Sequence, residues 1–357
     1  KKLNILLMNS IIIAKVIYTV THIKNNLISY FNKKEIENKL LKKFLGLAVE
    51  TINICNSTCT FCGYQYQTRE TGCMDRELFK KIILEYVEMG GGDLGLTPTV
   101  GEPLADKYLL ERIKFARSFD KIKEIGFSSN LISLARFNIK DFVNSGVTFM
   151  NISTSGFNQD MYKRIYRSKE YNRMYNNLTN LLKENNNSGN PIDINVEMRT
   201  DKTMNETLNF PDYQKLLQYL PAKKFGYKFR YDDWAGKIKQ SELAGTMKIR
   251  NMMLSMRFRY SACFEYYNGP SIYWNGDVGI CGCRDVDAKE LIIGNIKYNK
   301  ISDIWYNEKH LDYLNNFTNR MPEICKKCTH YDNLSTLNTV AWKNKINNAP
   351  DIQKSVN

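Results

Sequence analysis

Short apolar runs alternate with helical patterns from about residue 47 to residue 233. The runs have the length and composition of strands and lie at 47–54, 93–99, 124–129, 147–154, 192–199 and 225–232. Helical patterns lie between them, near 75–89, 106–118, 137–145, 159–184 and 211–220. Because strands that alternate with helices form repeated βα units, the sequence predicts an α/β fold with a parallel sheet of six strands.

The predicted strands have one polar and one apolar face, since side chains alternate along a strand. The apolar face carries Leu94, Ile125 and Met150, among others, and suits packing beneath helices. The polar positions are Thr51, Asn53, Thr97, Thr99, Ser128, Asn130, Asn151, Ser153, Ser155, Asn195, Glu197, Arg199, Lys228, Arg230 and Asp232. A closed eight-stranded barrel fills its interior with Val, Ile and Leu, so a lumen this polar is expected to hold a polar ligand and water.

Three basic side chains on the polar face, Arg199, Lys228 and Arg230, exceed what a neutral ligand requires. We therefore expect a carboxylate or phosphate in the lumen, unless neighbouring carboxylates pair with these cations as structural salt bridges. The sequence has only three histidines, so general-base work would fall to carboxylates near the mouth of the barrel. The candidates are Glu197, Asp232 and Asp233.

The N-terminal segment carries an apolar stripe at helical spacing. Its members are Ile5, Met8, Ile12, Val16, Val20, Ile23 and Leu27. Lysines interrupt and flank the stripe, which makes it a poor membrane span. We favour a helix docked on the main domain; the alternative is a basic amphipathic helix that contacts a membrane surface through residues 3–28.

Composition narrows the class of protein. The chain has 357 residues, 43% of them hydrophobic, which is enough for a sizeable core. The net charge of +14 would favour anionic partners, but Lys and Asn are spread along the chain, and no basic block with interleaved aromatic residues stands out. We therefore expect no nucleic-acid partner. The nine cysteines lack a secretory signal before them, so we expect reduced metal ligands in a cytoplasmic protein.

Three cysteines follow the first predicted strand directly, as Cys55-x3-Cys59-x2-Cys62. Three thiolates on one tight loop can hold three irons of a 4Fe-4S cluster and leave the fourth iron open for a small ligand. A zinc site would need a fourth ligand nearby. Cys73, eleven residues after Cys62, is interpreted as a free or structural thiol.

This loop resembles the signature of the radical S-adenosylmethionine (SAM) superfamily. The resemblance implies a partial (β/α)6 barrel and a SAM-binding 4Fe-4S cluster that a flavodoxin- or ferredoxin-type donor reduces. It also implies an enzyme that generates a 5′-deoxyadenosyl radical, which abstracts a hydrogen atom from a substrate carbon.

The resemblance extends to turns that bind SAM. After the second strand, Gly101-Glu102-Pro103 is similar to the turn that holds the SAM amino group, with Glu102 as the ligand. Asn130 closes the third strand at a position that faces the ligand in relatives. In the turn after the fourth strand Ser153 matches the family pattern, although Ser155 replaces its usual Asp. The remaining implied SAM contacts are Phe61 near the adenine, and Arg164 or Arg167 at the carboxylate.

A second cysteine set could bind another metal, and it consists of Cys263, Cys281, Cys325 and Cys328. Asn275-Gly276 between two apolar runs predicts a hairpin that brings Cys281 beside Cys263. The spacing alone permits a structural zinc site. The stretch resembles the SPASM/twitch module of radical SAM enzymes. Because no cysteine follows Cys328, the resemblance implies the shorter twitch form with one fully ligated auxiliary 4Fe-4S cluster.

Cys283 remains outside both sets. It could return a hydrogen atom to a substrate radical, as the resemblance to epimerases of the family implies; it could also be an alternate ligand or an inert buried thiol. Hydrogen return would give epimerisation. If instead the auxiliary cluster takes an electron and a base takes a proton, the result is dehydrogenation.

These features predict four regions: an N-terminal helical extension (1–46), the barrel (47–235), a linker with a twitch/SPASM-like domain (236–330) and a C-terminal tail (331–357). The predicted substrate is polar, anionic, and sugar-like or an aminocyclitol. One competing hypothesis is a maturase or epimerase of a ribosomally made peptide, although residues 1–46 are too few for a leader-recognition domain. Another is a basic zinc protein that binds nucleic acid.

Overall fold

The computed structural model describes residues 17, 19–43, 45–250, 259–282 and 284–351. Within these residues a sheet of nine strands has the order β11-β10-β9-β1-β2-β3-β4-β5-β6. From β1 to β6 each strand pairs in parallel with its neighbour, which confirms the predicted parallel sheet. The bounds are β1 (Leu47–Val49), β2 (Gly92–Gly95), β3 (Ile122–Ser129), β4 (Phe149–Ser155), β5 (Asp193–Arg199) and β6 (Phe225–Lys228).

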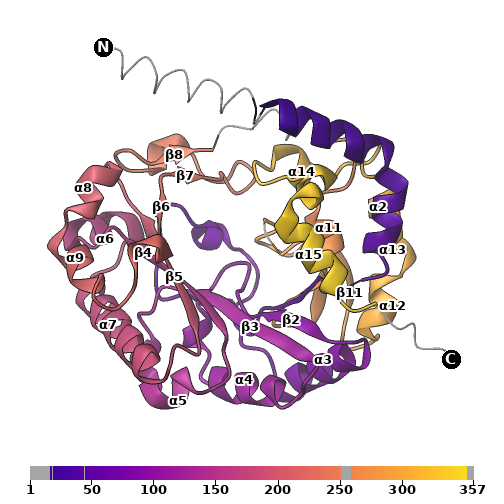
Figure 1. Cartoon of the computed structure of the whole chain (residues 1–357). Coiled ribbons are helices and arrows are strands. Elements are labelled where there is room, and N and C mark those ends of the chain that lie inside the picture. Colours follow the sequence, from indigo (N-terminus) through magenta and orange to yellow (C-terminus); the bar gives the residue numbers. More distant parts are fainter. Residues whose placement is uncertain (1–16, 18, 44, 251–258, 283, 352–357) are drawn as a thin grey trace, which may run out of the picture.

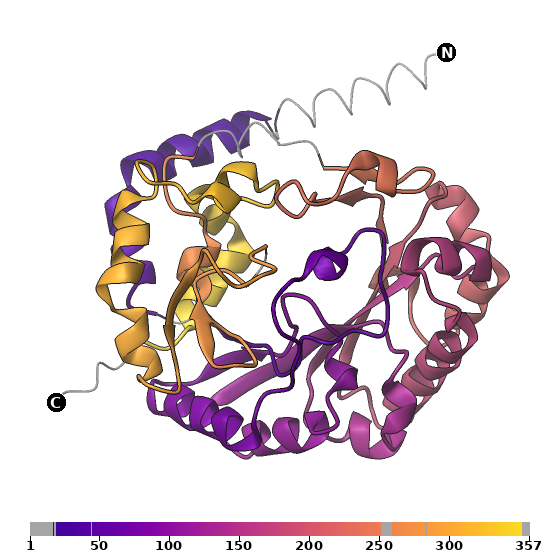
Figure 2. The ribbon, with the colours of Figure 1, turned by 180° about the vertical axis from the view of Figure 1, so that it is seen from behind.

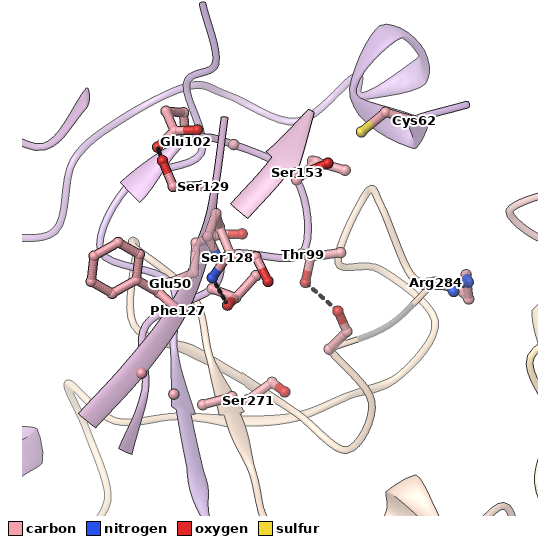
Figure 3. Close-up of a pocket in the computed structure, with 18 of the residues that line it drawn as sticks. Glu50, Cys62, Thr99, Glu102, Phe127, Ser128, Ser129, Ser153, Ser271 and Arg284 are labelled. Carbon is pink, nitrogen blue, oxygen red and sulfur yellow. Dashed lines mark hydrogen bonds between the residues drawn. The ribbon is translucent and has the colours of Figure 1, made fainter. Parts of the chain in front are cut away.

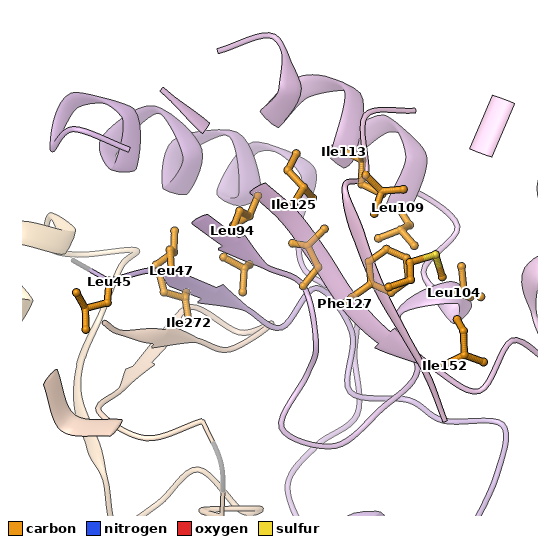
Figure 4. Packing of buried hydrophobic residues seen from close by; sticks show 14 of the residues in the cluster. Leu45, Leu47, Leu94, Leu104, Leu109, Ile113, Ile125, Phe127, Ile152 and Ile272 are labelled. Atoms are coloured by element: carbon orange, nitrogen blue, oxygen red, sulfur yellow. The ribbon is translucent and has the colours of Figure 1, made fainter. Parts of the chain in front are cut away.

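Helices cover the outer face of this curved sheet, as Figure 1 shows. They are α3 (Arg76–Glu88), α4 (Leu109–Arg117), α5 (Ile139–Val143), α6 (Gln159–Tyr166), α7 (Tyr171–Asn187), α8 (Met204–Leu208) and α9 (Pro211–Leu216). The apolar face of the strands packs beneath them, with Leu94 and Ile125 of the sheet close to Ile113 of α4 (Figure 4). The predicted division into an apolar outer face and a polar inner face is confirmed for these strands.

The predicted helix over 159–184 is wrong, because the structure has two helices there. Arg167 follows α6 in the left-handed conformation, with φ of 50°. A left-handed residue interrupts the helical hydrogen bonds, so the chain turns before α7 begins at Tyr171. Four residues therefore separate the two helices.

The first strand is shorter than predicted. Only Leu47–Val49 pair in the sheet, and the two polar positions that follow are buried elsewhere. Asn53 holds the loop that returns from the cysteine motif: its Nδ2 donates to the Glu70 carbonyl at 2.8 Å, and its Oδ1 accepts from the Gly72 N–H at 2.7 Å. Asn53 thus stabilises a loop, and neither Thr51 nor Asn53 lines the cavity.

The predicted sixth strand also ends early. After Lys228 the chain leaves the barrel wall, and β7 (Arg230–Tyr231) pairs with β8 (Lys248–Ile249) in a separate sheet. Arg230 is exposed and lies over the Phe229 ring at 5.3 Å. The prediction that Arg230 faces the lumen is wrong, because the alternation on which it relied stops where the pairing stops.

The C-terminal part of the described chain, residues 259–351 and called the second half below, extends the same sheet. Strand β9 (Ser271–Ile272) pairs in parallel with β1, and β10 (Asp277–Gly279) and β11 (Ile292–Asn295) follow in antiparallel pairing. The predicted hairpin at Asn275-Gly276 is confirmed, and Gly276 takes a positive φ of 92° in its turn. The helices of this half are α11 (Glu265–Asn268), α12 (Ile301–Trp305), α13 (Glu308–Asn316), α14 (Glu323–Lys327) and α15 (Val340–Asn348).

Both ends of the described chain pack on this second half. Trp342 of α15 lies edge-on to Phe264, with ring centroids 4.3 Å apart. At the other end residues 19–31 are helical and continue into α2 (Lys33–Leu40). The part of the predicted N-terminal stripe before residue 17 lies outside the described residues. No helix among the described residues is both long and apolar enough to cross a bilayer.

Candidate active site

A cavity of about 650 Å³ occupies the inside of the curved sheet. It runs from the loop that follows β1 to the opposite strand ends, and residues of the β9–β10 hairpin line one side (Figure 3). Figure 2 shows this loop inside the ring of strands and helices. Eight of the polar positions predicted for the lumen line it: Thr97, Thr99, Ser128, Asn130, Ser153, Arg199, Lys228 and Asp232. The polar lumen predicted from the alternation is therefore present.

Cys55, Cys59 and Cys62 line one end of this cavity. Their loop is fixed to the end of α6, because the Ser57 hydroxyl donates to the Tyr166 carbonyl at 2.5 Å and the Thr60 N–H donates to the Ile165 carbonyl at 2.9 Å. Short contacts between this loop and α6 hold the three thiols at fixed positions. The three thiols are therefore held at the wall of one cavity.

The donor set fits an iron–sulfur cluster with three cysteine ligands. The Cys62 Sγ accepts from the Tyr64 N–H at 3.5 Å, and Asn130 Nδ2 lies 3.9 Å from the Cys55 Sγ. Burial raises the pKa of Cys59 to about 12, so in the absence of a cation the thiol keeps its proton. Iron would displace that proton, since metals bind the thiolate.

Glu102 lies at the same end of the cavity and is 2% exposed. Its carboxylate accepts from the Ser129 hydroxyl at 2.6 Å, the Asn130 N–H at 2.8 Å and the Leu104 N–H at 3.1 Å. Burial outweighs these three donors and raises the pKa of Glu102 to about 7. Gly101 also lines the cavity, whereas Pro103 is buried beside it without lining it. A cationic group at this position would meet a carboxylate held in place by the backbone.

Aromatic rings and one guanidinium line the wall beside the cysteine loop. Phe61 stacks on Tyr231 and meets Tyr166 edge-on, each at 5.4 Å between ring centroids. The Arg199 guanidinium lies 4.5 Å from the Phe61 centroid, and its Nε donates to the Ser153 hydroxyl at 2.8 Å. The result is a flat apolar surface next to a fixed positive charge.

The arginines expected near SAM lie elsewhere. Arg164 forms two hydrogen bonds to Asp201, at 2.8 and 2.9 Å, and its side chain is 49% exposed. Arg167 is exposed and donates to Gln65. Neither lines the cavity, whereas the guanidinium groups of Arg199 and Arg284 do so near the cysteine loop.

Structural salt bridges hold the expected lumen cations. Arg199 and Lys228 both pair with Glu197, at 2.5 and 2.9 Å. The alternative that these cations form structural salt bridges is therefore confirmed for two of the three basic residues. Burial favours a raised pKa for Glu197, but the two cations outweigh it and lower the pKa below its ordinary value. Such a carboxylate is a weak base.

The other two candidate bases differ in position. Asp232 lines the cavity and pairs with Arg284 at 2.7 Å. Asp233 does not line it; its carboxylate accepts from the Thr329 hydroxyl at 3.0 Å. Cys283 lies outside the described residues, although its neighbours Gly282 and Arg284 line the cavity. Of the described candidates, only Asp232 lies on the wall.

Two cavity residues were not anticipated. Glu50 is 4% exposed and forms a bidentate pair with Arg69, with both distances 2.6 Å. Arg284 lies 4.6 Å from the Trp234 ring, whose Nε1 donates to the Phe61 carbonyl at 2.9 Å. The position of Glu50 directly after an apolar run could have predicted a buried carboxylate in the cavity. Nothing near Arg284 in the sequence predicts its ion pair with Asp232.

The second cysteine set lies away from this cavity. Burial raises the pKa of the Tyr266 phenol, and the nearby thiols of Cys325, Cys281 and Cys263 raise it further. The Tyr266 hydroxyl lies 3.1 Å from the Cys325 Sγ. The His330 N–H donates to the Cys328 Sγ at 3.3 Å. Among the described residues no three His, Cys, Asp or Glu side chains converge as they would on a single metal ion.

Comparison with known proteins gives two family matches. Residues 49–210 match the model of the radical SAM superfamily, and residues 263–329 match that of the SPASM iron–sulfur cluster-binding domain. A GTP 3′,8-cyclase of Thermodesulfovibrio yellowstonii is 27% identical over 177 residues, which cover 48% of this chain and 53% of the relative. A second, from Petrotoga mobilis, is 25% identical and covers 49% and 55%. The chain thus spans about half the length of the curated relatives it matches.

Solved structures share the fold. BtrN in complex with AdoMet and 2-DOIA is 17% identical with a TM-score of 0.52, and the match covers 82% of this chain and 94% of BtrN. Streptococcus suis SuiB bound to precursor peptide SuiA is 13% identical with a TM-score of 0.57, and the match covers 83% and 73%. At these identities the likeness concerns the fold alone.

Proposed function

Since this chain is a radical SAM enzyme with a C-terminal SPASM iron–sulfur domain, we propose that it abstracts a hydrogen atom from a polar, anionic sugar-like or aminocyclitol substrate. Its cofactors are the radical SAM 4Fe-4S cluster with SAM and the auxiliary SPASM cluster. When bound, the first cluster and SAM supply one-electron chemistry that can remove hydrogen from an unactivated carbon. Dehydrogenation or epimerisation is the proposed outcome.

We assign the first cluster to Cys55, Cys59 and Cys62, and the auxiliary cluster to Cys263, Cys281, Cys325 and Cys328. The first three thiols line the cavity and the other four do not. This difference supports an open site for SAM chemistry and a closed site for electron transfer.

The proposed SAM contacts follow from the wall beside the cysteine loop. Glu102 offers a carboxylate for the ammonium, and Phe61 offers a ring face for the adenine. Asn130 and Ser153 offer polar groups at the ends of β3 and β4. For the SAM carboxylate the proposed partner is Arg199, because Arg164 is bound to Asp201 outside the cavity.

The polarity of the cavity carries the substrate proposal. Hydroxyl groups of Thr97, Thr99, Ser128 and Ser271 line its wall, and they suit the hydroxyl groups of a sugar or cyclitol. Near the cysteine loop three cations, those of Arg199, Lys228 and Arg284, face two carboxylates in their salt bridges. Since Arg199 is assigned to the SAM carboxylate, Lys228 and Arg284 are the proposed partners of an anionic group of the substrate at that end.

The opposite end of the cavity is acidic. Asp93 and Glu124 line it, and Lys345 pairs with Asp93 at 3.4 Å. An amine placed there would find Glu124 on the wall. A substrate with an anionic group toward the cysteine loop and an amine toward the far end would satisfy both ends, as an aminocyclitol phosphate could.

For the proton, we assign Asp232 as the base, because among the described candidates it lies on the cavity wall. Arg284 pairs with it at 2.7 Å and orients its carboxylate. If epimerisation is the outcome, Cys283 is the proposed hydrogen donor, since the residues on both sides of it line the cavity.

Substrate-dependent release of 5′-deoxyadenosine tests the proposal. The protein is reconstituted anaerobically, and its iron is measured; two 4Fe-4S clusters correspond to about eight iron atoms per chain. The panel contains sugar phosphates, aminocyclitols, neutral sugars, GTP and synthetic peptides, with a Cys59→Ala chain as the blank. Release driven by a phosphorylated sugar or an aminocyclitol supports the proposal. Release driven by GTP or peptides alone would overturn it.

A further inference from the structure

The helix at residues 19–31 has its apolar side outward. Seven of the twelve large apolar side chains that the described residues expose lie between residues 17 and 31. They are Ile17, Val20, Ile23, Leu27, Ile28, Tyr30 and Phe31. Leu27 is 53% exposed and Phe31 79%. Spacings of three and four residues place most of them on one side of the helix, so the helix carries a continuous apolar stripe.

The opposite side of this helix docks on the protein through polar contacts. Asn26 accepts a hydrogen bond at 2.7 Å from Asn333, which precedes η6 (Leu334–Asn338). Ser29, one turn later, is fully buried. At the edge of the outward side the Tyr30 ring, 57% exposed, also meets Tyr260 edge-on at 5.6 Å. A surface helix of a globular protein normally buries its apolar side, and this one buries its polar side.

These contacts fix which side faces outward. The helix continues into α2, whose Glu37 accepts from the Tyr267 hydroxyl at 2.7 Å and whose Leu40 is buried. Figure 1 shows the helix at the rim of the molecule beside α14, away from the cavity. The stripe therefore belongs to a docked, oriented helix on the outside of the enzyme. Exposed apolar surface of this extent marks an interaction site.

The charge of this region identifies the partner. The sequence has no Asp or Glu before Glu35, and six lysines occupy the same stretch. Lys24 lies within the exposed side and Lys34 follows it. A second copy of the chain would bring like charges together, which disfavours pairing of two such helices. An anionic bilayer offers both an apolar layer for the stripe and negative headgroups for the lysines.

We propose that the helix at residues 19–31 lies in the interface of an anionic lipid bilayer and holds this enzyme at a membrane surface. The apolar stripe enters the boundary between headgroups and acyl chains, and Lys24 extends to the headgroups. The sequence favoured docking on the main domain over membrane contact; in this proposal the polar side docks and the apolar side binds lipid. The proposal does not depend on which substrate the enzyme uses.

Vesicle sedimentation with the full chain, carrying its clusters, tests this proposal. Vesicles of phosphatidylcholine with one quarter phosphatidylglycerol are compared with phosphatidylcholine alone. We expect about tenfold stronger binding to the anionic vesicles. Leu27→Ser with Phe31→Ser should lower that binding about tenfold, and Lys24→Glu about fivefold. Tyr298→Ser is the matched control, because Tyr298 is an exposed apolar ring far along the chain, 82% exposed, and it should bind as the unaltered protein does.

Three results would overturn the proposal. The first is equal sedimentation of the unaltered chain and the Leu27→Ser, Phe31→Ser variant. The second is equal binding to both kinds of vesicle. The third is a dimer in light scattering that the same variant abolishes, because the stripe would then pair with a second copy. SAM cleavage measured on each variant shows that the fold and the active site are intact, so a loss of binding is separable from a loss of function.

Discussion

The two cysteine sites of this enzyme are built in opposite ways. The first takes three thiols from one loop, Cys55 to Cys62, and places them on the wall of a cavity. The second takes four thiols from three segments between Cys263 and Cys328 and places them away from that cavity. A short loop can hold a cluster and still leave one side open. We expect segments far apart in sequence to enclose their cluster, which would then stabilise the fold as well as carry electrons.

This contrast predicts different consequences for the loss of one ligand. In the open site the loop is already held by α6 through Ser57 and Thr60, so the protein should fold without the cluster and lose only chemistry. In the closed site the cluster itself joins the segments, and metal-binding free energy then becomes folding free energy. The predictions below test this difference.

The largest effect is expected for Cys59→Ala. With two thiols left, the first cluster should be lost, and iron should fall from about eight to about four atoms per chain. SAM cleavage should fall by more than about a thousandfold, because no other group supplies the electron at that site. Anaerobic iron analysis and 5′-deoxyadenosine release measure both. Cys73→Ala is the matched control, since Cys73 is an exposed thiol that donates a hydrogen bond to Asp106. Full iron content in Cys59→Ala would refute the assignment of the first cluster.

A smaller loss of SAM cleavage but a larger loss of stability is expected for Cys325→Ala. The auxiliary cluster should disappear, again leaving about four iron atoms, while SAM cleavage should stay within about tenfold. Conversion of substrate should fall about a hundredfold if this cluster accepts the electron. The melting temperature should drop further than in Cys59→Ala, as scanning calorimetry under argon would show. Equal melting temperatures in the two variants would remove the contrast between an open and a closed site.

A tenfold effect is expected from pH at the open site. Burial raises the pKa of Glu102 to about 7, above its ordinary value, so the carboxyl is neutral below that pH and an anion above it. Only the anion attracts the ammonium of SAM. The kcat/KM for SAM should therefore rise about tenfold between pH 6 and pH 8. Glu102→Gln should remove this rise, whereas Glu124→Gln, at the far end of the cavity, should keep it; a rise that survives in Glu102→Gln would contradict the proposed role.

Prediction from sequence succeeded for structural features that depend on residues close together in the chain. The cysteine loop, the Asn275-Gly276 hairpin and the alternation along β3 to β5 all involve short-range patterns. The parallel sheet and the polar lumen followed from them. The continuation of the sheet through the β1–β9 pair did not, because it joins residues more than two hundred positions apart.

Prediction failed where a contact is long-range or where an element ends. Arg164 was expected near SAM because of its position in the family pattern, but its partner Asp201 comes from after β5. Arg199 lay in the predicted lumen, yet only the structure shows it beside Phe61. Arg230 was misplaced because alternation continues in the sequence after the pairing of β6 has stopped. Sequence patterns therefore located the walls of the site better than the ion pairs within it.

The smallest effect concerns the closed site alone. The Tyr266 hydroxyl lies 3.1 Å from the Cys325 Sγ, and next to an iron-bound thiolate it would act as the donor. A hydrogen bond to sulfur stabilises the reduced, more negative cluster, so Tyr266→Phe should lower the reduction potential of the auxiliary cluster. A bond of about 1 kcal/mol corresponds to about 40 mV for one electron.

Redox titration followed by electron paramagnetic resonance can resolve such a shift. The first cluster is the internal control, because Tyr266 does not line its cavity and its potential should stay constant. Tyr313→Phe provides the matched variant: Tyr313 meets Tyr266 edge-on at 6.4 Å, but its hydroxyl donates to the Glu290 carbonyl. A shift in both clusters would mean that the two sites are coupled through the fold. A shift confined to the auxiliary cluster would show that a side chain of the closed site sets the reduction potential of that cluster without affecting the potential of the first cluster.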